Sequence, residues 1–87
     1  YNNYPNPFNP ETRIKYSLKE PEEVTVAIFD LRGNEIRRLV HARQTPGWYE
    51  IVWDGRDQSG AGVSTGVYFC RMQTKTYSES RKMVYLK

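Results

Sequence analysis

The chain has 87 residues, which allows one domain with a thin core, because a domain this small buries little more than half of its unfolded surface. Apolar residues make up 38% and charged residues 26%, a composition that suits a small soluble domain and argues against disorder. The net charge of +3, without a dense basic patch, argues against nucleic-acid binding.

Residues 1–10 are predicted to be an uncharged, proline-rich lead-in to a single domain over residues 11–87. Prolines fix φ and push the preceding residue to an extended conformation, so the lead-in should be stiff and polyproline-like. We expect Phe8, with Pro5 and Pro7, to anchor it against the edge of the domain. There is no initiator methionine and no signal peptide, so we expect a piece of a longer protein.

The first part of the domain alternates apolar and polar residues with the period of a β-strand. In Thr12–Leu18 the residues Ile14, Tyr16 and Leu18 share one face. Val24–Leu31 is apolar on both faces, which predicts a central strand.

The segment Glu35–Ala42 allows two interpretations. Leu39 and Val40 follow Ile36 by three and four residues, so the three side chains could share a helix face. The strand patterns on both sides and the turn at Gly33 favour a strand with a bulge, and the helix stays open as the alternative.

Three further strands are predicted in the second half, at Trp48–Trp53, Gly66–Gln73 and Tyr77–Lys87. Trp48 and Trp53 fall on opposite faces, so one of them could be exposed, and Cys70 should be a small core residue. Six or seven short strands with turns every 8–12 residues or so predict an all-β antiparallel sandwich.

No group of residues suggests a catalyst, a metal site or a cofactor. Asp54–Gly60 clusters carboxylates, but it lacks the spacing of a calcium loop, so Asx turns with Gly55 and Gly60 at positive φ are expected instead. His41 is the single histidine, and the sequence has no G-x-S-x-G nucleophile turn. A chain this short can hardly enclose a cleft, so we expect no enzyme activity.

Two surface features suggest binding. An exposed Trp48 with tyrosines nearby could stack on a sugar or anchor a protein contact, unless both tryptophans pack. Residues 71–87 hold five basic residues and one acidic residue, a net charge of +4, whereas residues 1–70 sum to −1. The last strand could therefore meet an acidic partner or anionic lipid headgroups, or it could be a solvated strand face.

Several sequence blocks resemble a known family. Tyr4–Pro10, followed by Thr12-x-Ile14-x-Tyr16, resembles the opening of the C-terminal sorting domains of the type IX (Por) secretion system. Further matching blocks are Val24–Ile36, Trp53–Gly60, Gly66–Phe69 and Arg81–Met83. The same string is similar to the immunoglobulin-like domain of the flagellar hook-capping protein, and the Pro-Asn-Pro-Phe block favours the sorting family.

The resemblance implies an immunoglobulin-like sandwich that directs a larger secreted hydrolase or adhesin through the type IX outer-membrane translocon. The chain would pass through the periplasm to the cell surface or beyond. A sortase-like peptidase would then attach the passenger to anionic lipopolysaccharide. We expect a monomer whose last strand is read by strand addition. The implied recognition residues are Gly66, Val67, Tyr68, Phe69, Arg81, Lys82, Met83, Val84, Tyr85, Leu86 and Lys87.

The alternative is a structural or accessory immunoglobulin-like module. It would be either a hook-cap-like assembly domain or a carbohydrate-binding appendage of a hydrolase.

Overall fold

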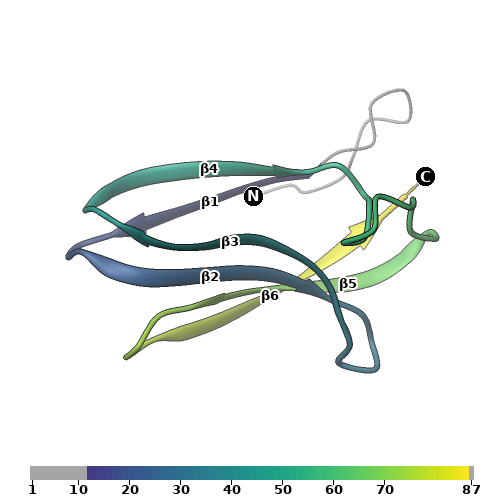
Figure 1. Cartoon of the computed structure of the whole chain (residues 1–87). Coiled ribbons are helices and arrows are strands. Elements are labelled where there is room, and N and C mark those ends of the chain that lie inside the picture. The colour runs from purple at the N-terminus through teal and green to yellow at the C-terminus, as the bar shows by residue number, and fades with distance from the viewer. Residues whose placement is uncertain (1–11, 87) are drawn as a thin grey trace.

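The computed structural model describes residues 12–86, which form six strands in two antiparallel sheets and no helix. The strands are β1 (Thr12–Leu18), β2 (Glu22–Phe29), β3 (Glu35–Gln44), β4 (Gly47–Trp53), β5 (Gly66–Gln73) and β6 (Ser78–Tyr85). One sheet is β1-β4, and it lies over the other, which has the order β3-β2-β5-β6 (Figure 1). The predicted all-β sandwich is confirmed, and it has six strands between residues 12 and 86.

Some predictions fall outside the described residues. The lead-in residues Pro5, Pro7 and Phe8 lie there, and so does Lys87. Within residues 12–86, no helix is present that could cross a membrane.

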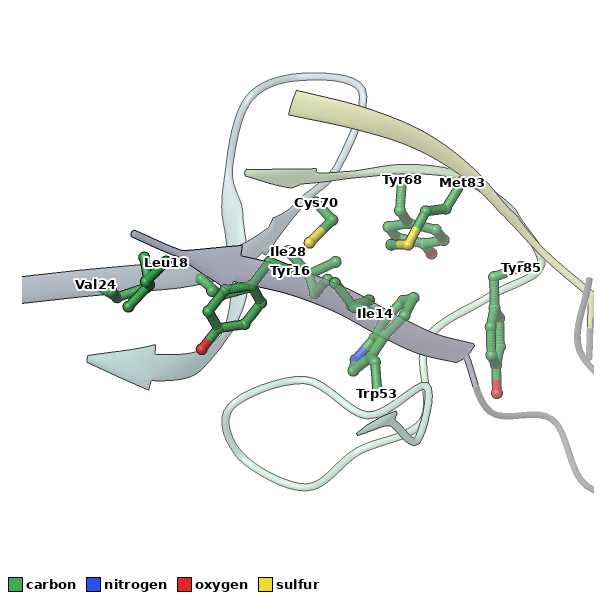
Figure 2. Close-up of a cluster of buried hydrophobic side chains, with 11 residues drawn as sticks. Ile14, Tyr16, Leu18, Val24, Ile28, Trp53, Tyr68, Cys70, Met83 and Tyr85 are labelled. Carbon is green, nitrogen blue, oxygen red and sulfur yellow. The ribbon is translucent and has the colours of Figure 1, made fainter. Parts of the chain in front are cut away.

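The core lies between the two sheets, where the alternating residues of each strand meet. Ile14, Tyr16 and Leu18 of β1 are all buried, as their spacing predicts. Figure 2 shows Ile14 and Tyr16 beneath Cys70 and Tyr68 of the opposite sheet. Burial of these side chains removes apolar surface from water and is the main favourable contribution to folding.

The central strand is β2, which pairs with β3 on one side and β5 on the other. Its register with β3 shifts twice, and at each shift β3 carries one additional residue, first Leu39 and then Ile36. Each bulge changes the alternation along β3, so Ile36, Leu39 and Val40 can all pack against the core. The predicted strand with a bulge is therefore confirmed, and the bulges explain the helix-like spacing.

Both ends of the described chain lie at the same end of the sandwich (Figure 1). Thr12, the first residue of β1, pairs with Trp53 at the end of β4. The ring of Tyr85, the last residue of β6, lies 5.2 Å from the Trp53 ring between centroids. Trp53 is fully buried, so the two ends of the described chain meet around the largest fully buried side chain of the core.

Candidate functional site

The Trp-Asp-Gly block is a packing unit. The Trp53 indole Nε1 donates a hydrogen bond to the Arg56 carbonyl oxygen at 3.0 Å. Gly55 has a φ of +76°, and a Cβ built there would overlap the ring of Tyr85. The block therefore joins the end of β4 to β6, and the buried indole N–H of Trp53 has its hydrogen-bond partner.

The loop after this block is held by turn chemistry, as predicted. The Asp57 Oδ1 atom accepts hydrogen bonds from the Ser59 hydroxyl at 2.7 Å and from the backbone amides of Ser59 and Ala61 at 3.0 Å each. These hydrogen bonds lower the pKa of the Asp57 carboxyl, and the bond from the Ser59 hydroxyl has the largest effect. Gly60 takes the expected positive φ of +93°. Within residues 12–86, no three His, Cys, Asp or Glu side chains gather where they could hold a metal.

In the Gly66–Phe69 block, Tyr68 also has a structural role. The Tyr68 hydroxyl donates to the Ser64 carbonyl oxygen at 2.7 Å, and its ring meets Trp53 edge-on at 5.4 Å. The hydrogen bond ties the loop to β5, and the ring contact adds to the core.

The predicted recognition residues are divided between core and surface. Tyr68, Met83 and Tyr85 belong to the core cluster, as Figure 2 shows. The exposed members are Arg81, Lys82 and Leu86, whereas Gly66, Val67, Phe69 and Val84 are half-buried. A partner at this surface can therefore reach only some of them.

Cys70 is a core residue, as expected. Its thiol is free and buried, and desolvation raises its pKa to about 11. Because the thiolate is the reactive form, this thiol is a poor nucleophile at neutral pH.

Of the two tryptophans, which the alternation puts on opposite faces of the strand, Trp48 is the exposed one. Its side chain lies on the outer face of β4 and is 83% exposed, whereas Trp53 is 0% exposed. An exposed aromatic of this size is typical of a contact point.

A groove runs between β1 and β6, which we call the β1–β6 seam. In the described part of the chain, β1 pairs only with β4 and β6 only with β5, so each strand presents an edge. Across the seam, Arg81 Nη1 donates to the Lys15 carbonyl oxygen at 3.3 Å. Hollows of about 400 Å³ and about 650 Å³ lie along it, and both contain Arg81 in their walls.

The two ends of the β1–β6 seam differ in character. The smaller hollow has an apolar floor, and its charged wall residues are all basic: Arg13, Arg81 and Lys82. The larger hollow includes the exposed aromatics Trp48 and Tyr77, 83% and 49% exposed. Sequence reasoning missed the seam, because it depends on which strands become neighbours in space.

Comparisons with known proteins agree on one family. The model of the family described as "FlgD Ig-like domain" matches residues 6–78 of the chain. Among solved structures, FlgD from P. aeruginosa is similar with a TM-score of 0.69 and 23% identity, over 95% of this chain. The chain spans 66% of that FlgD chain, and the likeness shows the shared fold. No curated protein matches.

These matches correct the sorting interpretation. Both point to FlgD and neither to a type IX sorting domain, so the predicted export function is wrong. The predicted route through the periplasm to the cell surface is wrong with it, because it depended on that function. The shared blocks around Trp53 and Tyr68 misled because they build the core of the sandwich. Contacts with a translocon, a peptidase or lipopolysaccharide are implied by that resemblance alone, and no match bears on them.

Proposed function

The chain belongs to the FlgD Ig-like domain family, and we propose that it is a hook-cap-like assembly module of a larger protein. In this role it catalyses no reaction and holds protein subunits together through its surface. The observation that carries the proposal is the family match, which extends over residues 6–78.

The placement of the polar residues supports a role without catalysis. Asp30 accepts hydrogen bonds from the backbone amides of Arg32 and Asn34, both at 2.9 Å, so it serves a turn. The His41 Nδ1 atom lies 3.2 Å from the Thr25 hydroxyl on an exposed strand face. Neither group lies in an enclosed site where its geometry would suit acid–base chemistry.

Trp48 supports an assembly contact. It stands on β4, paired with the polar Ser17 of β1, and most of its surface is exposed to water. Exposed aromatic side chains of this kind supply much of the binding energy when a partner covers them.

The test follows the parent protein in the cells that make it. Antibodies against this domain would detect the parent protein after surface appendages are sheared off and sedimented. We expect the parent protein in a fraction much heavier than a single chain. We expect Trp48→Ser to move it to the light fraction, whereas Leu31→Ser, at a residue 70% exposed in a distant turn, should not.

Two results would contradict the assembly role. One is a parent protein that sediments as a free chain in every fraction. The other is retention on insoluble polysaccharide that requires Trp48, which would identify a carbohydrate-binding appendage. The monomeric state of the isolated chain stays a prediction.

A further inference from the structure

The edge of β1 that faces the β1–β6 seam can accept another strand. The Lys15 carbonyl oxygen points into the seam, where Arg81 donates to it at 3.3 Å. Backbone groups alternate in direction along an antiparallel strand, so those of Arg13 and Ser17 face the seam as well. A segment pairing with this edge would extend the two-stranded sheet β1-β4 to three strands, a more stable arrangement for an antiparallel sheet.

The charge at one end of the seam selects the partner. Arg13, Arg81 and Lys82 are exposed around the smaller hollow, and among the described residues no acidic side chain lines it. Arg13 and Arg81 make ion pairs at 3.4 Å with Glu50 and Glu79, and both pairs are open to solvent. Exposed ion pairs contribute little to stability, so a carboxylate from a partner can replace Glu50 or Glu79 at small cost in free energy.

The floor of the same hollow favours an apolar side chain next to the charge. Ile14, Cys70 and Met83 line it and are buried in the core. In an extended strand successive side chains point to opposite sides. A segment that alternates apolar and acidic residues can therefore place apolar side chains on the floor and carboxylates beside the basic wall. At the far end, Trp48 and Tyr77 offer aromatic surface to a further apolar group.

We infer that the β1–β6 seam binds an extended acidic segment of a partner protein, which adds to the edge of β1 as a third strand. This rests on the proposed assembly role and names one of its docking sites. The lead-in of the chain itself is a poor occupant, because residues 1–10 contain three prolines and no carboxylate.

The test uses the 87-residue chain and short capped peptides. One peptide alternates valine with glutamate, and the matched peptide alternates valine with lysine. Amide chemical shifts of the labelled chain are followed by NMR as each peptide is added to millimolar concentration. We expect the glutamate peptide, but not the lysine peptide, to shift the amide signals of β1 and β6. This binding should weaken as salt is added.

Two variants separate charge from strand pairing. Arg81→Glu should weaken binding of the acidic peptide by about tenfold or more, because it replaces an attraction with a repulsion. Arg43→Glu makes the same charge change on β3, the opposite edge of the larger sheet, and should leave binding unchanged. Lys15→Pro removes a seam-facing amide and should abolish binding, while unshifted β4 amides show that the β1–β4 ladder remains.

Several outcomes would overturn the inference. These are no shifts at millimolar peptide, equal binding of the lysine peptide, or equal losses in the Arg81 and Arg43 variants. Concentration-dependent shifts at the seam without peptide would assign it to a second copy. Binding that appears only after removal of residues 1–11 would assign it to the chain itself. Because sedimentation of the parent protein is a separate measurement, failure here and failure of the assembly role are distinguishable.

Discussion

Replacing Gly55 with alanine tests how the loop after β4 is joined to the core. The backbone there has a φ of +76°, which a residue with a Cβ adopts at a cost of about 1 kcal/mol. The added methyl group would also overlap the ring of Tyr85, which is 3% exposed and packs on Trp53. Forcing an additional carbon into a packed core costs about 1–3 kcal/mol.

The sum is a loss of about 2–4 kcal/mol in the free energy of unfolding, a large part of the stability of a domain this small. It corresponds to a fall in melting temperature of about 8 °C or more, since 1 kcal/mol shifts a domain of this size by about 4–8 °C. Urea and thermal unfolding followed by tryptophan fluorescence and circular dichroism would measure it, because Trp53 is fully buried.

A matched control isolates the overlap with Tyr85. Gly33 has a φ of +87°, but a Cβ there meets nothing within 4 Å, so Gly33→Ala should cost only the backbone term of about 1 kcal/mol. Tyr85→Leu should remove most of the additional cost of Gly55→Ala in a double-mutant cycle. Equal losses for the two glycine variants would refute the argument that Tyr85 closes over Gly55.

Three more predictions concern single side chains. Tyr68→Phe should lower the free energy of unfolding by about 0.5–1.5 kcal/mol in urea titrations, because it removes the hydrogen bond to the Ser64 carbonyl; an unchanged midpoint would contradict this role. Cys70, with its pKa raised from 9.0 to about 11, should hold about 100-fold less thiolate at pH 8 and react with Ellman's reagent only on unfolding; rapid labelling of the folded chain would show an accessible thiol. Asp57 has a pKa below its ordinary value of 3.8, so its contribution to stability is complete above that pH and is lost as the pH falls through the folded pKa. Carboxyl NMR titration should give a midpoint below 3.8 that rises in Ser59→Ala; a midpoint at or above 3.8 would exclude the Asx turn.

Much of the fold could be predicted because the chain encodes it locally. Strict alternation identified the buried face of β1, and it placed Trp48 and Trp53 on opposite sides of β4. Glycines at turns predicted the positive φ of Gly55 and Gly60. These features depend only on the neighbours of each residue along the chain.

The rest depended on contacts between distant segments. The two bulges in β3 arise where its register with β2 shifts, so the apolar spacing of Ile36 and Leu39 could not distinguish strand from helix. The seam exists because β1 and β6 lie at the edges of different sheets, and no local pattern states the strand order. The function was misjudged because residues such as Tyr68 match the sequence blocks of two families, whereas in this chain Tyr68 serves the core of the sandwich.

The first and last strands of the described chain start and finish at the same end of the sandwich, which has a mechanical consequence. Tension between Thr12 and Tyr85 pulls across the strands rather than along them, because both residues lie beside Trp53. The hydrogen bonds between β1 and β4 then carry the force one after another, starting at the Thr12–Trp53 pair, so they break in sequence rather than together. The Arg81–Lys15 hydrogen bond links β6 to β1, the two strands that carry the force. A segment paired with β1 would add hydrogen bonds that must also break.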